Sequence, residues 1–227
     1  MDVIELLWGE RGAPRRGPRP TLTVGDLAKA GIELADAEGL AAVTMQRVAE
    51  ALGVTKMATY RYVPGKDELV ALMADTAMGE PPSLDDIEGG WRPRLRAWTL
   101  AMYERMRAHP WALSVTTGPR VTGPNELGWV EQALAALDGV ALDGGQMLDI
   151  VAALTGQIRT IVEQTANNNS EEEMAAGWAA VLETRADRFP HVVAALTSAA
   201  RHESRDQGLE FGLDRILDGV ELYLSRK

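Results

Sequence analysis

The stretch that decides the fold runs from Leu40 to Leu69 and reads LAAVTMQRVAEALGVTKMATYRYVPGKDEL. Two short helices fit it, and each has a start signal, because the hydroxyls of Thr44 and Thr55 can accept from an N–H group at a helix start. Gly53 separates the helices, since a residue just past a helix end often takes a positive φ, which glycine adopts without steric cost. The second helix is expected to reach about Val63 before a Pro-Gly pair stops it. Together these signals predict a helix-turn-helix.

The second helix of such a motif lies in the major groove of DNA, with its N-terminal residues nearest the base edges. Its predicted outward side chains are Lys56, Met57, Thr59, Tyr60, Arg61 and Tyr62. This mixture of cations, hydroxyls and aromatic rings is typical of a DNA-facing surface. The alternative interpretation is a small packed helical corner whose polar residues are incidental.

The same stretch resembles the DNA-binding signature of the TetR family, the tetracycline-repressor-like transcriptional regulators. The matching positions are Gly39, Thr44, Ala49, Gly53, Val54, Tyr60, Val63, Lys66 and Leu69. The resemblance covers about Leu22 to Met78 and extends more loosely to the C-terminus. It implies an N-terminal three-helix helix-turn-helix domain followed by a larger helical domain for ligand binding and dimerisation.

Composition agrees with an all-α protein that has a substantial core. The chain has 227 residues, of which 46% are hydrophobic, and strand signals are scarce beside helical periodicity. The sequence contains no run of eighteen apolar residues, so no membrane-spanning helix is predicted. The first ten residues are too acidic for a secretory signal. Cysteine is absent, which excludes disulfides and thiolate metal sites. We therefore expect a cytoplasmic protein.

The net charge of −10 is unevenly distributed along the chain. Residues 11–66 carry nine Lys and Arg against five Asp and Glu, which gives +4, whereas the remainder carries fourteen against twenty-eight, which gives −14. The local charge, not the net charge, indicates where DNA is contacted. The acidic remainder would repel DNA and confine contact to one face.

Three segments are predicted. Residues 1–22 are rich in Gly, Pro and Arg, so we expect a flexible arm without a helix. Arg15, Arg16 and Arg19 of this arm are candidates for the minor groove or for phosphates, although a leader without a role is an equal alternative. Residues 23–80 form the predicted DNA-binding domain. Residues 81–227 form the predicted ligand-binding and dimerisation domain, which follows the Gly- and Pro-containing boundary at 79–83.

The chemistry of the side chains divides the DNA contacts into two groups. Hydroxyls, cations and helix starts suit phosphates, and the candidates are Thr44, Thr55, Tyr60, Arg61, Tyr62 and Lys66. The resemblance adds base-edge contacts from Gln46, Lys56 and Met57. Lys56 could donate to guanine, and Met57 could pack on a thymine methyl group.

The last helix, from about Leu209 to Leu224, is apolar over more than half its circumference and therefore needs a second partner. This helix and the segment 147–162 are the best candidates for a four-helix homodimer interface, as the resemblance also implies. A dimer would present two reading helices to a palindromic operator. The alternative is that both faces are used within one subunit.

The resemblance implies that a small-molecule inducer binds the second domain and releases the DNA. The pocket candidates, each of which could equally be core, are Trp98, Met102, Met106, Trp111, Trp129, Met147 and Arg159. Tetracycline-binding members hold a metal–drug complex with a His and a Thr in one loop. The corresponding loop here, residues 114–119, has no His, and Glu163 alone makes no metal site. The sequence therefore leaves the identity of the inducer undecided, and no metal or cofactor is expected.

Two other classes of function compete with this interpretation. An enzyme is disfavoured because the three histidines are scattered and no nucleophile, phosphate-loop or metal motif is present. A helical protein-interaction module that has lost DNA binding is disfavoured by Thr55, Tyr60 and Lys66. The sequence does not decide between an activator and a repressor, and repression is the default because no separate activation segment is visible.

Overall fold

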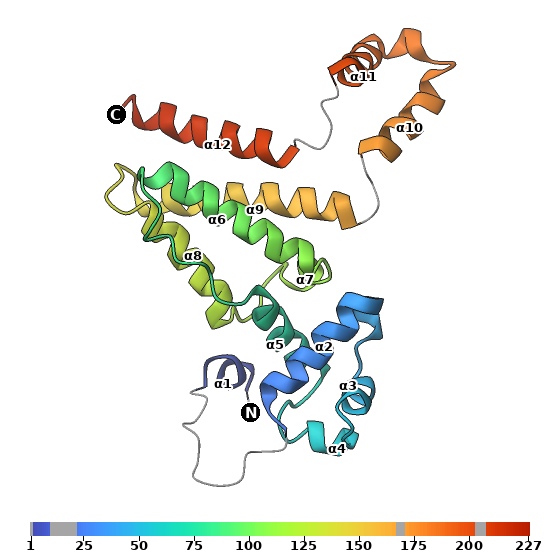
Figure 1. Cartoon of the computed structure of the whole chain (residues 1–227), viewed down its shortest axis with the longest axis vertical. Helices are drawn as coiled ribbons and strands as arrows, with labels where there is room; N and C mark the ends of the chain where they lie inside the picture. The colour runs from blue at the N-terminus through green and yellow to red at the C-terminus, as the bar shows by residue number, and fades with distance from the viewer. Residues whose placement is uncertain (1, 10–21, 167–170, 203–207) are drawn as a thin grey trace. The chain divides into compact units, whose positions relative to one another are not determined.

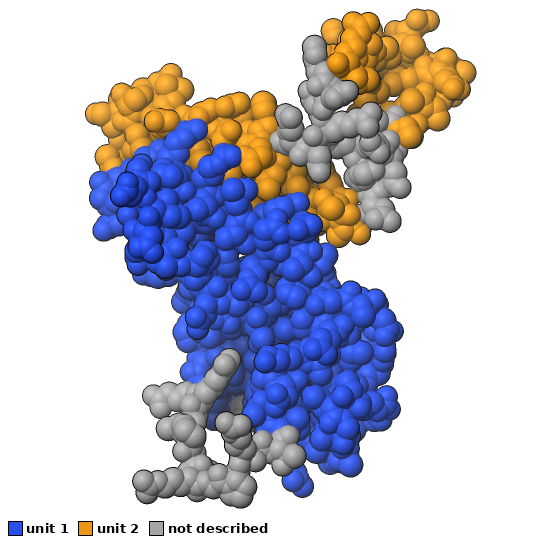
Figure 2. All heavy atoms as spheres, viewed as in Figure 1, with its two compact units in different colours: residues 1–140 blue, residues 141–227 orange. Residues whose placement is uncertain are grey.

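The computed structural model describes residues 2–9, 22–166, 171–202 and 208–227, and the regular structure in these ranges is helical throughout (Figure 1). The all-α prediction is thus confirmed. The chain divides into two compact units, residues 1–140 and residues 141–227 (Figure 2).

The first unit holds the helix-turn-helix and the helices that support it. Its helices are α1 (Val3–Trp8), α2 (Val24–Glu38), the short 3-10 helix η1 (Leu40–Ala42), α3 (Met45–Ala51), α4 (Lys56–Thr59), α5 (Lys66–Met78), α6 (Trp91–Ala108), α7 (Ala112–Val115) and α8 (Pro124–Ala136).

The second unit contains two long helices and a shorter pair between them in sequence. Its helices are α9 (Gly144–Ala166), α10 (Glu171–Leu182), the 3-10 helix η2 (Ala186–Arg188), α11 (Pro190–His202) and α12 (Gly208–Leu224).

The core under the helix-turn-helix is built where α2 crosses α5. Leu27 of α2, Val48 of α3 and Leu69 of α5 are fully buried together. Gly31 permits the close approach, because a Cβ at this position would lie 2.5 Å from the sulfur of Met73. Burial of this apolar surface, at about 25 cal/mol per Å², is what holds the reading helix in place.

The N-terminal prediction was wrong for residues 3–8, which form helix α1. The helix breakers begin only at Gly9, so the preceding apolar residues are free to become helical. Leu7 packs into the core cluster, and the indole Nε1 of Trp8 donates to the carbonyl oxygen of Thr122 at 3.0 Å. Helix α1 therefore docks on the first unit, in contact with α5.

A buried carboxylate joins α5 to α8. Asp75 is only 5% exposed, and one of its oxygens accepts from the main-chain N–H groups of Asn125 (2.9 Å) and Glu126 (3.1 Å). The Asn125 amide returns a bond to the Asp75 carbonyl oxygen. Asp75 thus caps the N-terminus of α8, where N–H groups lack partners within the helix. A Cβ at Gly123 would lie 2.2 Å from this carboxylate, so only glycine fits there.

Two further contacts tie the helix-turn-helix core to α6–α8. The indole Nε1 of Trp129 donates to the carbonyl oxygens of Met78 (3.3 Å) and Gly79 (3.0 Å), at the end of α5. Asp36 of α2 accepts from the indole Nε1 of Trp111 at 2.7 Å, and its carboxylate lies 2.9 Å from Nδ1 of His109. Because of these contacts the predicted domain boundary at 80/81 lies inside the first compact unit. The boundary was predicted as the division between the DNA-binding domain and the ligand-binding and dimerisation domain, and it stays a prediction.

In the second unit, α9 and α12 pack closely along their length (Figure 1). Leu154 and Ile158 of α9 and Leu213 and Leu217 of α12 are fully buried. The side chain of Gln157 on α9 lies against Gly212 of α12, where a Cβ would be 2.3 Å from the Gln157 amide nitrogen. The predicted apolar stripe of the last helix is thereby confirmed.

A capping box formed by Thr23 and Asp26 holds the start of α2. The hydroxyl of Thr23 accepts from Asp26 N–H at 3.1 Å, and the Asp26 carboxylate accepts from Thr23 N–H at 2.8 Å. The Thr23 hydroxyl also donates to the Asp26 carboxylate at 2.7 Å, and this bond, followed by the one from the Thr23 N–H, holds the pKa of Asp26 below its ordinary value. A lowered folded-state pKa stabilises the fold above the unfolded-state pKa, and the stabilisation is lost as the pH falls through the folded-state value.

We expect Thr23→Ala to lower the free energy of unfolding by about 1 kcal/mol near neutral pH, since it removes a helix cap. The difference from the wild type should shrink as acid protonates Asp26. Urea unfolding at a series of pH values measures it. Thr197→Ala, which removes an exposed threonine within α11, is the matched control and should change little. An unchanged difference in acid would contradict the role of Asp26.

Candidate nucleic-acid interface

Helices α3 and α4 form the predicted helix-turn-helix, and both predicted caps are present. The Thr44 hydroxyl accepts from Arg47 N–H at 3.2 Å, and the Thr55 hydroxyl accepts from Ala58 N–H at 3.3 Å. Gly53 lies between the helices with φ +64°, as the sequence predicts. A hydroxyl that accepts a helix N–H keeps its own hydrogen for donation, for example to a phosphate oxygen.

The reading helix is shorter than predicted. Helix α4 ends at Thr59, and the chain continues in turns to Val63, whose N–H still reaches the Thr59 carbonyl oxygen at 3.1 Å. Proline at position 64 disfavours helical geometry in the residue before it, and the aromatic and β-branched residues from 59 to 63 have modest helix propensity. Buried Val63 then fixes the turn against the core.

The outward face of this segment carries the predicted cations and an exposed methionine. Met57 is 73% exposed, and Lys56, Tyr60 and Arg61 are also exposed. The Lys56 ammonium lies 5.8 Å from the centroid of the Tyr60 ring, within cation–π range, so these two side chains support each other.

Two of the predicted outward side chains are placed differently. Thr59 is fully buried, and its hydroxyl donates to the Lys56 carbonyl oxygen at 2.7 Å. Tyr62 is half-buried and packs against the core cluster. Thr59, the last residue of α4, lies on the buried side of that helix, and the turn after it brings Tyr62 toward the core. A phosphate contact by Tyr62 stays a prediction.

Helix α3 presents polar groups that sequence reasoning did not connect. The amide Nε2 of Gln46, a predicted base reader, donates to a carboxylate oxygen of Glu50 at 2.7 Å, and both residues are exposed. Gln46 and Glu50 are four residues apart, which places them on one face of the helix. This spacing is the sequence feature from which their contact could have been predicted.

Arg47 is engaged with an acidic partner. Its guanidinium makes two bonds to the Glu38 carboxylate, at 2.9 Å and 2.5 Å, which joins α3 to the end of α2. The hydrogen bonds and the positive charge hold the pKa of Glu38 below its ordinary value, and the same contact raises the pKa of Arg47. Arg47 therefore positions α3.

Lys66 is exposed at the first position of α5, as predicted. N–H groups at a helix start and the helix dipole favour an anion, and a lysine there adds a full positive charge. A phosphate fits this combination. The N-terminal arm candidates Arg15, Arg16 and Arg19 lie outside the described residues.

Most of the predicted pocket residues are core. Trp98 and Trp129 are 0% and 1% exposed, meet edge to face at 6.2 Å, and are joined by a bond from Trp98 Nε1 to the Trp129 carbonyl oxygen. Met102, Met106 and Trp111 are also buried. The half-buried candidates are Met147 and Arg159, both on α9.

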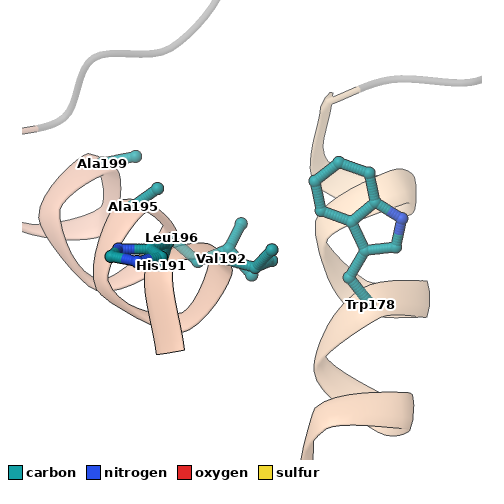
Figure 3. Close-up of a pocket in the computed structure, with 6 residues that line it drawn as sticks. All are labelled: Trp178, His191, Val192, Ala195, Leu196 and Ala199. Carbon is teal, nitrogen blue, oxygen red and sulfur yellow. The ribbon is translucent and has the colours of Figure 1, made fainter. Parts of the chain in front are cut away.

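The sequence did not single out an apolar hollow between α10 and α11 (Figure 3). Its volume is about 400 Å³, and Trp178 of α10 faces His191, Val192 and Leu196 of α11 across it. Trp178 is about half exposed. The sequence feature that could have indicated this hollow is the tryptophan in the α10 segment, because an indole is a large, mainly apolar side chain.

Two classes of site have no support in the part of the chain that the structure describes. There, no group of three or more acidic, histidine or cysteine side chains is arranged to hold a metal ion. Within the same residues, no helix combines the length and the apolar character needed to cross a bilayer.

The fold and this surface define a helix-turn-helix transcriptional regulator. Residues 27–73 match the family described as bacterial regulatory proteins, tetR family. Residues 82–224 match the family described as tetracyclin repressor-like, C-terminal domain. The chain therefore belongs to the TetR family, which confirms the resemblance noted in its sequence.

Individual relatives agree. The chain is 35% identical over 239 aligned residues to the HTH-type transcriptional repressor DrrR1 of Streptomyces coeruleorubidus, covering 99% of this chain and 87% of that protein. In fold it is similar to apo ActR of Streptomyces coelicolor, with TM-score 0.77, 21% identity and coverage of 92% and 99% of the two chains. ActR in complex with actinorhodin gives TM-score 0.71, 21% identity and coverage of 87% and 94%.

We expect Lys66→Ala to weaken binding to all DNA sequences alike, because a phosphate contact carries no sequence information. The slope of log affinity against log salt should flatten by about one unit. Fluorescence anisotropy with cognate and random duplexes over a salt series measures both. Lys227→Ala, in the second unit, is the matched control and should leave the slope unchanged. A loss confined to one cognate sequence would show that Lys66 reads bases.

Proposed function

We propose that this protein is a ligand-responsive transcriptional repressor. As a homodimer it binds a palindromic DNA operator, and a small-molecule inducer releases it. The exposed surface of the helix-turn-helix carries the proposal: Lys56, Met57, Tyr60 and Arg61 project from a segment whose other side is fixed in the core. The repressor mode is supported by the relative DrrR1.

Within this proposal, the DNA contacts divide by chemistry. Thr44, Thr55, Tyr60, Arg61, Tyr62 and Lys66 bind phosphates, and Gln46, Lys56 and Met57 face base edges. Arg15, Arg16 and Arg19 of the N-terminal arm are proposed to reach the minor groove or flanking phosphates. Phosphate contacts set the register, and base contacts set the sequence.

The surface of α9 and α12 supports the homodimer. A groove of about 410 Å³ runs along it, lined by apolar and small residues that include Ile150, Ala153, Ile216 and Gly219. Leu148 and Leu222 on the same two helices are each 53% exposed. A second copy of the same groove would cover this apolar surface in a two-fold arrangement.

We propose that the inducer binds the C-terminal domain; ActR, a protein of similar fold, forms a complex with actinorhodin. Met147 and Arg159 are the predicted pocket residues that are neither fully buried nor fully exposed. The hollow between α10 and α11 is a second location, because its apolar lining suits a hydrophobic molecule.

Selection of genomic fragments by the purified protein at about 150 mM salt, where non-specific binding is weakened, tests the proposal. We expect a short palindrome whose half-sites lie one helical turn, about 34–36 Å, or a multiple of it apart. Genes beside the recovered site would indicate the inducer class. If folded dimeric protein recovers no sequence, operator binding is contradicted, and a helical protein-interaction module becomes the better interpretation.

We expect Ala153→Glu to convert the dimer to a monomer, because an uncompensated charge buried in an apolar interface costs about 3 kcal/mol or more. Sedimentation velocity measures the change, and affinity for the palindrome should fall with it. Ala37→Glu, which introduces the same charge at an exposed position of α2, is the matched control. A dimer that survives Ala153→Glu would place the interface elsewhere.

A further inference from the structure

The bond between Gln46 and Glu50 fixes the orientation of an amide on the DNA-facing side of α3. A carboxylate only accepts hydrogen bonds, so the nitrogen of the Gln46 amide must be the atom turned toward Glu50, at 2.7 Å. The amide oxygen of Gln46 is then directed away from Glu50. The hydrogen-bond chemistry thereby assigns which end of the amide is turned away from Glu50.

We infer that Glu50 sets the base preference of Gln46, so that the pair selects a base with an exocyclic amino group, adenine or cytosine. This inference rests on the proposed operator binding. In the major groove, adenine N6 and cytosine N4 are donors, whereas guanine and thymine present oxygen acceptors. The outward amide oxygen of Gln46 accepts from the amino groups of adenine and cytosine. It is repelled by the acceptor oxygens of guanine and thymine. The remaining amide hydrogen can donate to adenine N7, which favours adenine.

The charge of Glu50 argues for a role in specificity. A carboxylate on a DNA-facing helix lowers affinity for the phosphate backbone. The guanidinium of the nearby Arg47 makes its side-chain hydrogen bonds to Glu38, although its charge also acts on Glu50, and Gln46 donates the hydrogen bond that Glu50 accepts. The Glu50 carboxylate opposes binding to DNA in general, but through Gln46 it permits contact with one kind of base edge. Such a group discriminates against the wrong sequences.

The competing explanation is that Glu50 only stabilises α3, as pairs four residues apart on a helix do. That explanation predicts a small loss of stability and no change in the bases selected. A free Gln46 amide can rotate and offer its nitrogen to guanine, so loss of Glu50 relaxes selectivity only if Glu50 holds the amide. Base selection, not affinity, therefore separates the two.

The test is selection from random duplexes by the full-length protein and by Glu50→Ala, Gln46→Ala and Glu33→Ala. The wild type should select adenine or cytosine at one position of each half-site, with a preference of at least about tenfold over guanine and thymine. Glu50→Ala and Gln46→Ala should both reduce it to below about threefold, at that position only. Glu33→Ala, which removes an exposed charge on α2, should retain it.

The outcomes separate two failures. If the wild type recovers no palindrome, the proposed operator binding fails. If it recovers one and the Glu50→Ala profile is the same as that of the wild type, the inference about Glu50 is overturned. Circular dichroism checks folding. If Glu50→Ala is unfolded, Glu50→Gln replaces it: the new amide can offer either its oxygen or its nitrogen, so Gln46 is no longer fixed and the preference should relax.

Discussion

The buried carboxylate of Asp75 is the constraint on which the first unit depends. It lies on α5 and satisfies the N–H groups at the start of α8, which would otherwise lack partners. A buried polar group left without hydrogen bonds is costly, so these bonds hold the two helices in one register. Gly123 is required for the same reason, since any side chain there would overlap the carboxylate. The carboxylate and the glycine together define how closely the helix-turn-helix core meets the helices that follow.

This constraint gives α5 two functional ends. Lys66 begins the helix on the side of the reading surface, and Asp75 lies near the other end, where the carbonyl oxygens of Met78 and Gly79 accept from Trp129. A helix of this length, about 20 Å at 1.5 Å per residue, transmits displacement because its own hydrogen bonds keep it straight. A movement of α8 must therefore carry α5 with it or break charged hydrogen bonds. In the proposed function, α5 is the element that would carry a ligand-induced movement of α8 to Lys66.

The structural features that could be predicted from the sequence are those that depend on residues close together along the chain. Caps at Thr23, Thr44 and Thr55 span three residues, so the side chain and its N–H partner can be identified from spacing alone. The length of α4 was overestimated because burial of Thr59 and Val63 against the core decides where the helix ends. Helix α1, the Asp75 cap and the Trp111–Asp36 bond join residues 50 or more positions apart, or depend on a docking surface that only the folded chain provides. Local hydrogen bonds were therefore predictable, and long-range ones were not.

The distribution of acidic groups explains how a chain with net charge −10 can present a surface suited to DNA. Three acidic residues of the helix-turn-helix core have partners within the protein: Glu38 with Arg47, Asp36 with Trp111 and His109, and Asp75 with the start of α8. Lys56, Arg61 and Lys66 remain exposed. The Glu38–Arg47 ion pair offsets one negative charge with one positive charge, and the hydrogen bonds to Asp36 and Asp75 hold those two carboxylates in contacts within the protein. Glu50 differs because it is exposed among the residues proposed to face DNA, and an unfavourable charge in that position is best explained by the base that it helps to select.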